Sequence, residues 1–292
     1  MTDRPRPPPG PAPHRLPGAR ADADGPPETG LHGAPDQSAD QSADQSADRA
    51  PNRAADCALD CALEAKAFGA AAVLGPIRFT LAPGERAALL GASGTGKSTL
   101  LAILAGLDRA YRGRIARGPG RLAMVFQTPR LLPWRTLAEN IALIPGVDGE
   151  GAARRALAEV GLAALTDAYP EKVSLGQQRR AALARALAVR PALLLMDEPL
   201  VSLDPENAAA MRALIRRVLD ETGAAALIAT HDRREALGLC DRVLFLRGSP
   251  ASLAADRPSP LDRAQQQDSA AVEALHGRWF DEPGPAGPPA DA

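Results

Sequence analysis

The sequence lacks a dominant charge of either sign, and it contains almost no lysine. Its 292 residues include 34 lysines and arginines against 35 acidic residues, which leaves a net charge of −1. Without an overall basic field, we expect no nucleic-acid partner. Only Lys66, Lys97 and Lys172 are lysines, so nearly all basic residues are arginine.

Long apolar runs are also missing. No stretch approaches the roughly 20 apolar residues that a membrane-spanning helix requires. The first ten residues, MTDRPRPPPG, lack the apolar core of a signal peptide. We therefore expect a cytoplasmic protein that reaches a membrane only through a partner.

Cysteine is scarce, with Cys57, Cys61 and Cys240 the three examples. Cys57 and Cys61 could share a helix face, but two thiols without a nearby histidine or further cysteine make a poor zinc site. Disulfides are rare in a reducing compartment. We interpret all three as buried or incidental thiols.

Large apolar residues are nearly absent from the beginning of the chain. Residues 1–55 are rich in proline, glycine, alanine, aspartate and arginine, and they include the tract QSADQSADQSAD at 37–48. Such a segment cannot bury enough surface to offset the entropy of ordering, so we expect a disordered tail with a linker-like repeat. The folded domain is predicted over 56–253, with a mostly flexible extension at 254–292.

The most informative stretch that is present is GASGTGKST, Gly91–Thr99. It follows the apolar run 86–90 and precedes the helix-like stretch 100–107. The pattern G-x-x-x-x-G-K-[ST] between a strand and a helix is that of a phosphate-binding loop. Backbone N–H groups of such a loop surround phosphate oxygens, and the helix N-terminus adds partial positive charge.

Within this loop, Lys97 is expected to reach the β- and γ-phosphates as a point charge, and the Ser98 hydroxyl to hold Mg²⁺. The remaining loop residues expected to contact nucleotide are Gly91, Ser93, Gly94, Gly96 and Thr99.

Polar side chains follow three further apolar, strand-like runs. Gln127 follows 122–126, Asp197 and Glu198 end the run LLLMDE, and His231 follows 224–230. In open α/β sheets ligands bind at the carboxyl ends of strands. We expect Asp197 to orient Mg²⁺ through water, Glu198 to act as general base, Gln127 to contact Mg²⁺ or the attacking water, and His231 to hydrogen-bond the γ-phosphate.

Two weaker signals lie outside these strand ends. Ser174 and Gly176 precede a helix that runs to about 189, and its free N–H groups could bind a second anion, although an ordinary capped helix has the same pattern. Phe68 could stack on a nucleotide base, or it could simply be a core phenylalanine.

Six motifs occur together in the order and spacing of an ATP-binding cassette (ABC) ATPase. They are GASGTGKST, Gln127, VSLGQ at 173–177, LLLMDE, SLD at 202–204 and His231. The resemblance covers about 57–253. It implies an α/β P-loop NTPase (RecA-like) core, an antiparallel β subdomain and an inserted α-helical subdomain at about 131–190. By the same resemblance Phe68 stacks on adenine, Gln127 is the Q-loop glutamine, Ser174–Gln177 form the signature, and Asp204 belongs to the D-loop.

The resemblance also implies a head-to-tail dimer, with each ATP between the phosphate loop of one subunit and the signature of the other. One residue departs from the family pattern: Leu175 stands where the family usually has glycine. Glycine there lets backbone approach phosphate. Leu175 could weaken closure of the dimer, or its side chain could point away.

The segment 125–143 resembles the nitrate, sulfonate and taurine group of bacterial importer ATPases. Leu132, Pro133 and Trp134 in it could form an apolar docking surface for a membrane subunit, or Trp134 could pack within the helical subdomain. Genes encoding a permease and a solute-binding protein beside this one would support a transport role.

We therefore expect an ATPase that uses ATP and Mg²⁺ and drives solute uptake, with permease subunits, a solute-binding protein and a second ATPase subunit as partners. It would lie at the inner face of the membrane through the permease. Two alternatives are a soluble, non-transport ABC ATPase and a weakly hydrolysing binding module. The single cassette without heptad repeats argues against the first, and intact Glu198 and His231 argue against the second.

Overall fold

The computed structural model describes residues 57–281, which lie within one compact unit. The tails predicted at 1–55 and 282–292 lie outside the described residues. No helix between 57 and 281 is long and apolar enough to cross a membrane. Cys57, Cys61 and Cys240 are all buried, which confirms the interpretation of three buried thiols.

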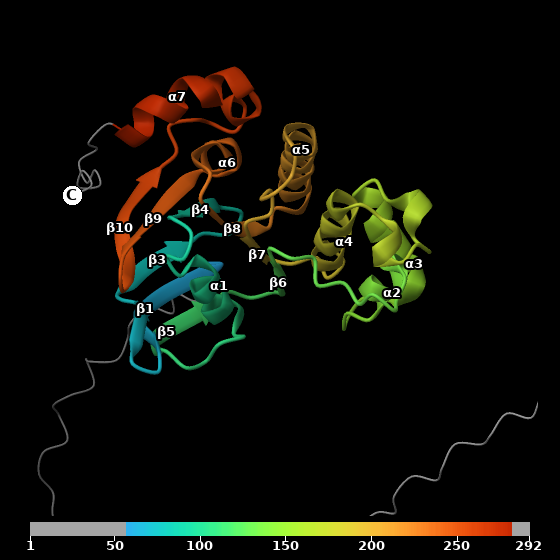
Figure 1. Cartoon of the computed structure of the whole chain (residues 1–292), viewed down its shortest axis with the longest axis horizontal. Coiled ribbons are helices and arrows are strands. Elements are labelled where there is room, and N and C mark those ends of the chain that lie inside the picture. The colour runs from blue at the N-terminus through green and yellow to red at the C-terminus, as the bar shows by residue number, and fades with distance from the viewer. Residues whose placement is uncertain (1–56, 282–292) are drawn as a thin grey trace, which may run out of the picture. The chain divides into compact units, whose positions relative to one another are not determined.

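A twisted sheet forms the centre of the fold (Figure 1), with the strand order β3-β1-β2-β10-β9-β4-β8-β7-β6 and with β5 paired to β1. Strands β9, β4, β8, β7 and β6 run parallel to one another. Their bounds are Arg242–Gly248, Arg86–Leu90, Ala225–Thr230, Leu193–Asp197 and Leu122–Val125. This parallel sheet confirms the predicted P-loop NTPase core.

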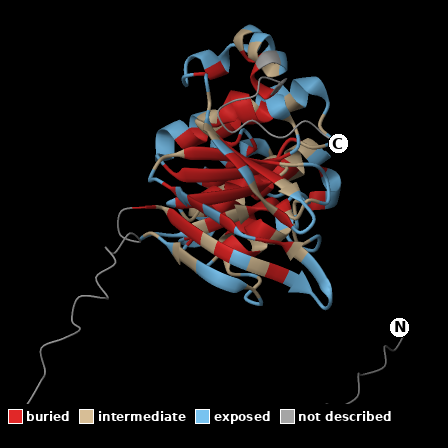
Figure 2. Cartoon of the chain, turned by 90° about the vertical axis from the view of Figure 1, so that its left-hand side faces the viewer, coloured by how far each residue is buried: buried red, intermediate tan, exposed pale blue. Residues whose placement is uncertain are grey.

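The parallel strands read as continuous apolar runs because both faces of the sheet are covered (Figure 2). Since side chains alternate between faces, each strand contributes to two clusters. Leu89, Leu195 and Leu227 pack with helix α1 (Lys97–Ala105). Their neighbours, such as Met196 and Ile228, belong to the cluster on the other face, which also includes the later helices.

The antiparallel subdomain is built on the ten-residue strand β1 (Leu59–Phe68). It pairs antiparallel with three other strands, which are β2 (Ala71–Leu74), β3 (Ile77–Leu81) and β5 (Arg112–Arg117). The family resemblance implied an antiparallel β subdomain here, and the structure shows one long strand that carries the three others.

Three helices occupy the region predicted as the helical insertion: α2 (Leu137–Ala142), α3 (Gly149–Glu159) and α4 (Leu175–Leu187). Short 3₁₀ turns at Ala163–Leu165 and Pro170–Lys172 join α3 to α4. Thr136 and Ser174 each start their helix with a capping box, in which the side chain accepts from the third helical N–H. Helices α5 (Pro205–Thr222) and α6 (Arg233–Leu239) follow β7 and β8.

The expectation of a mostly flexible extension after 253 is wrong for residues up to 281. Strand β10 (Ala251–Pro258) pairs antiparallel with β9, and a 3₁₀ turn at Gln265–Gln267 leads into α7 (Ser269–Asp281). Trp279 and Phe280 of α7 are buried against Phe245 of β9, with ring centroids 6.0 and 5.9 Å away. Two aromatic side chains give this segment enough buried apolar area to stay ordered, despite its polar composition.

Candidate functional site

The predicted site residues follow four neighbouring parallel strands. The phosphate loop follows β4, His231 follows β8, Asp197 and Glu198 lie at the end of β7, and Gln127 follows β6. Because carboxyl ends of parallel strands lie along the same edge of a sheet, these side chains meet there. Strand order therefore assembles groups that are up to 134 residues apart in sequence, from Lys97 to His231.

The phosphate loop depends on its glycines for backbone conformation and for close packing. Gly94 and Gly96 have φ values of +80° and +97°, which glycine adopts at little cost. A Cβ on Gly91 would lie 2.9 Å from the Leu246 carbonyl oxygen, and one on Gly96 would lie 2.7 Å from Leu74 Cδ2. No acidic residue occupies the first turn of α1, so the helix itself places no negative side chain beside its free N–H groups.

Lys97 is buried and folds back over this loop. Its Nζ donates to the carbonyl oxygens of Gly91 at 2.8 Å and Ala92 at 3.0 Å, and lies 3.4 Å from Glu198 Oε1. Burial of a charged lysine, here 4% exposed, costs free energy because the ammonium group loses its hydration. The three oxygen partners offset that cost. The ammonium group therefore lies inside the loop where phosphates would bind.

Glu198 is the point at which the predicted catalytic side chains converge. Its Oε1 lies 3.3 Å from His231 Nδ1 as well as 3.4 Å from Lys97, and its Oε2 accepts from Gln127 Nε2 at 3.3 Å. Glu198 has a φ of +46°, an uncommon conformation for a non-glycine residue. Backbone strain of this kind persists where the surrounding structure holds it, often at functional sites.

Asp197 and Ser98, two of the residues predicted to hold magnesium, lie close together. Burial raises the pKa of the Asp197 carboxyl, the Ser98 side chain opposes that rise, and one carboxylate oxygen, Oδ1, is buried with no hydrogen-bond partner. A hydroxyl and an orphaned carboxylate oxygen suit Mg²⁺, which uses one or two protein oxygens and completes its shell with phosphates and water. Within 57–281, no group of three or more His, Cys, Asp or Glu side chains could hold a metal alone.

The signature residues are not part of this cluster. Ser174 Oγ accepts from the Gln177 N–H at 3.3 Å, and the Gln177 side chain accepts from the Ser174 N–H at 2.8 Å, so each is occupied in capping α4. A Cβ on Gly176 would meet only Asn207 and Leu203 at ordinary distances. The Leu175 side chain is 46% exposed.

The contacts described for Phe68 and Asp204 are likewise with residues other than Glu198. Phe68 is 54% exposed at the end of β1, with the Lys66 ammonium 4.3 Å from its ring centroid, so the core-phenylalanine alternative is wrong. Its strand partner β2 supplies Leu74, which packs against Gly96 of the phosphate loop. Asp204 caps α5 by accepting from the Asn207 N–H at 3.0 Å.

Sequence reasoning missed two arginines that tie α4 to the site. Arg185 donates to the carbonyl oxygens of Arg130 at 2.7 Å and Pro129 at 2.9 Å, which follow Gln127 in the chain. Arg179 donates to the carbonyl oxygen of Val201, three residues after Glu198. In the sequence, these two arginines are marked only by their position inside a predicted helix. Their acceptors are backbone carbonyl groups of distant loops, which only the tertiary structure brings close. Helix α4 is thus bonded to both catalytic loops.

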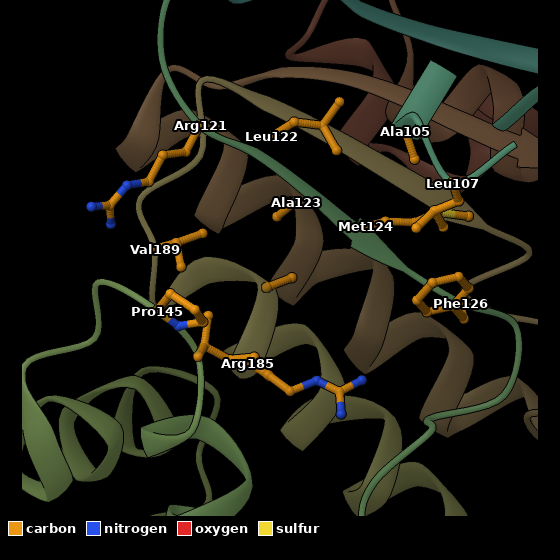
Figure 3. A pocket seen from close by; sticks show the side chains of 12 residues that line it. Ala105, Leu107, Arg121, Leu122, Ala123, Met124, Phe126, Pro145, Arg185 and Val189 are labelled. Carbon is orange, nitrogen blue, oxygen red and sulfur yellow. The ribbon is translucent and has the colours of Figure 1, made fainter. Parts of the chain in front are cut away.

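A groove of about 590 Å³ lies between β6 and the helical insertion (Figure 3). Its apolar lining includes Met124 and Phe126 from β6 and the residue after it, and Pro145 and Val189 from the insertion, with Arg185 of α4 also lining it. Trp134 is 69% exposed, so the alternative that it packs within the helical subdomain is wrong. Apolar surface is therefore exposed on the part of the chain that follows Gln127.

Comparison with known proteins agrees with this geometry. The family model described as "ABC transporter" matches residues 74–201. The chain is 43% identical over 219 residues to the aliphatic sulfonates import ATP-binding protein SsuB 1 of Burkholderia lata, covering 73% of this chain and 68% of the relative. It is 41% identical over 218 residues to SsuB 2 of Paracoccus denitrificans, covering 74% of this chain and 88% of the relative.

Solved structures share the fold at lower identity. The cbiO1 protein of Clostridium perfringens, part of the ABC transporter complex cbiONQ, has a TM-score of 0.63 and 24% identity, over 76% of this chain and 96% of that one. A dimeric post-hydrolysis state of an ATP-binding cassette bound to ADP and Pi has a TM-score of 0.60 and 24% identity, over 70% of this chain and 100% of that one.

Proposed function

Because the chain belongs to the ABC transporter family of ATP-binding proteins, we propose that it is the ATP-hydrolysing subunit of a solute importer. As an ABC ATPase, it binds nucleotide and hydrolyses ATP. The observation that carries the proposal is the convergence of Lys97, Gln127 and His231 on the Glu198 carboxylate.

In this proposal Glu198 is the general base that takes a proton from the attacking water. Gln127 and His231 orient the two oxygens of its carboxylate, and both side chains are exposed enough to reach water or a phosphate oxygen. Lys97 exchanges its loop carbonyl partners and Glu198 for the β- and γ-phosphates when ATP binds. That exchange leaves Glu198 free to accept a proton.

Ser98 and Asp197 are the residues that would hold Mg²⁺, on the strength of the orphaned Asp197 oxygen. When bound, Mg²⁺ neutralises charge that develops on the phosphates. Asp197 is then a buried carboxylate with a cationic partner, which offsets the cost of its desolvation.

The signature supports a composite site. Ser174, Gly176 and Gln177 start α4, which belongs to the cluster on the sheet face opposite α1. A signature that completes an ATP site must then come from a second subunit, so we propose a head-to-tail dimer of two copies of this chain. Asp204 and Phe68 are proposed nucleotide or dimer contacts in that assembly.

The apolar groove beside β6 and the exposed Trp134 are proposed to bind a membrane-embedded permease subunit. This contact would hold the ATPase at the inner face of the membrane, with a solute-binding protein completing the importer. The relatives' names favour an aliphatic sulfonate as the solute, within the nitrate, sulfonate and taurine group.

Replacing Glu198 by glutamine tests the proposal. Glu198→Gln keeps the size of the side chain and its contact with Gln127, but it cannot accept the proton, so steady-state ATP hydrolysis should fall by roughly 10² or more. ATP binding should persist, and gel filtration with ATP should show a trapped dimer.

The matched control is Glu221→Gln, which removes an exposed carboxylate from α5 and should leave turnover unchanged. Wild-type turnover in Glu198→Gln would remove Glu198 as the general base.

A further inference from the structure

A second cavity, of about 110 Å³, is lined by residues of α5, α6, the 3₁₀ turn and the start of α7. Three of its eight lining residues are arginines. Arg212 and Arg216 come from α5, Arg234 from α6, and Gln266, Ser269 and Glu273 from the 3₁₀ turn and α7. It shares no lining residue with the predicted nucleotide site.

Arg212 and Arg216 are separated by one helical turn, a spacing at which like charges repel. Arg216 Nη1 donates to the Gln266 carbonyl oxygen at 2.8 Å, and burial together with the charge of Arg212 lowers its pKa. Arg212 makes no hydrogen bond or ion pair within the described residues, and its Nε is buried without a partner. Two guanidinium groups are thus partly desolvated side by side.

Nearby carboxylates do not supply full counter-charges. Glu273 is already bound by Arg234 through two hydrogen bonds, of 2.7 and 2.9 Å. Asp220 is paired with Arg86 at 2.5 Å. Glu235 feels the charge of Arg212, but burial raises its pKa to about 7, so it is only partly ionised at neutral pH. The cavity therefore holds uncompensated positive charge.

Two further features favour a bound oxyanion. Gln266 is 2% exposed, and its Oε1 has no hydrogen-bond partner while its Nε2 donates to the Cys240 and Leu261 carbonyls. That oxygen needs a donor, which the hydroxyl of hydrogen phosphate supplies. Gly238 lines the cavity without contributing a side chain to it.

We propose that this cavity is a binding site for inorganic phosphate. Arg212 and Arg216 bind its oxygens, as charge-assisted hydrogen bonds to guanidinium groups favour, and the Ser269 hydroxyl in the lining adds a donor. The volume is several times the roughly 30 Å³ share of one water molecule, so a tetrahedral oxyanion fits. Bound phosphate would link α5, α6 and α7.

Phosphate can also bind the phosphate loop, so the test uses a background in which that loop is weakened. Binding of radiolabelled inorganic phosphate to full-length Lys97→Ala is measured by equilibrium dialysis, and saturable binding of one phosphate per chain is expected. Adding Arg212→Gln to this background should weaken it by roughly tenfold or more. The matched control is Arg155→Gln, which removes the same charge from an exposed site on α3 and should change nothing.

Two outcomes would overturn the proposal. The first is no saturable phosphate binding by Lys97→Ala, which would place phosphate in the nucleotide site only. The second is equal weakening by Arg155→Gln and Arg212→Gln, which would indicate diffuse surface charge.

Discussion

At the scale of single residues, Glu235 is the buried titratable group whose environment is best defined. It is 3% exposed, and its Oε2 accepts from Thr230 Oγ1 at 2.5 Å, next to His231. Burial raises its pKa from 4.5 to about 7, the charges of Asp232 and Glu198 add to this, and the Thr230 hydrogen bond and Arg212 oppose it. The folded protein therefore binds this proton more tightly than the unfolded chain.

Because Glu235 binds its proton more tightly in the folded protein, the free energy of unfolding depends on pH. The contribution of Glu235 to stability is fully present below its unfolded pKa of 4.5 and is lost as the pH rises to about 7. Glu235→Gln resembles the protonated form, so it should raise the free energy of unfolding at pH 8 by about 1–3 kcal/mol, with little change near pH 4.5. Urea unfolding of both proteins across this range measures it. A constant difference at all pH values would contradict the assignment.

At the scale of secondary-structure elements, α4 connects Ser174 to the loops that follow Glu198 and Gln127. Ser174 caps its start, while Arg179 and Arg185 bond to carbonyl oxygens of those loops. One helix therefore links the proposed signature to both loops. Leu175 lies in the first turn, 46% exposed in the single chain.

Leu175→Gly tests whether this side chain hinders dimer closure. In a closed dimer, Leu175 would lie where the backbone at the start of α4 approaches the phosphates of the ATP that the other subunit binds. Its removal should therefore raise steady-state ATP hydrolysis about fivefold, which corresponds to a decrease of roughly 1 kcal/mol in the activation free energy. The control is Leu143→Gly, which removes another exposed leucine of the helical insertion, at the end of α2. Unchanged turnover in Leu175→Gly would show that the side chain points away from the interface.

The loop that precedes α2 carries the second prediction at this scale. Trp134 is exposed, although large aromatic side chains usually bury most of their area. Trp134→Ala should reduce copurification with a permease by roughly tenfold, since buried tryptophans dominate many interfaces. Tyr169→Ala, at an aromatic residue 45% exposed in the same insertion, is the control. Full recovery of the complex with Trp134→Ala would exclude Trp134 from the permease contact.

At the scale of the whole molecule, every side chain placed in the proposed ATP site lies between Phe68 and His231, well inside residues 57–281. Strand β10 lies between β2 and β9 in the sheet and α7 packs against α6, so both C-terminal elements belong to the ATPase unit. The folded unit is therefore longer than the 56–253 that motifs alone delimited.

An N-terminal truncation tests whether the segment before the folded unit contributes to turnover. Deleting residues 1–50 should leave steady-state ATP hydrolysis unchanged, within about twofold, because no residue of the proposed site is removed. ATP hydrolysis by the purified truncated and full-length proteins provides the measurement. Substantial loss of activity would assign the N-terminal segment a role in turnover.

The sequence by itself determined the fold class and the chemistry of the strand ends. A phosphate loop requires glycines at positive φ and a lysine at a set spacing, and these are local properties that a short motif records. Buried parallel strands need unbroken apolar runs, as at Leu193–Asp197. Gln127, Asp197, Glu198 and His231 were found because each follows such a run.

Only the tertiary structure decided which of these groups touch. Lys97, Gln127 and His231 converge on Glu198 because β4, β6 and β8 lie in one sheet with β7, and strand order depends on contacts distant in sequence. The same holds for α7, which is ordered because two aromatic side chains find Phe245, and for the arginine cavity between α5, α6 and α7. Local patterns carry no information about such partners, since burial and pairing arise only when distant segments pack together.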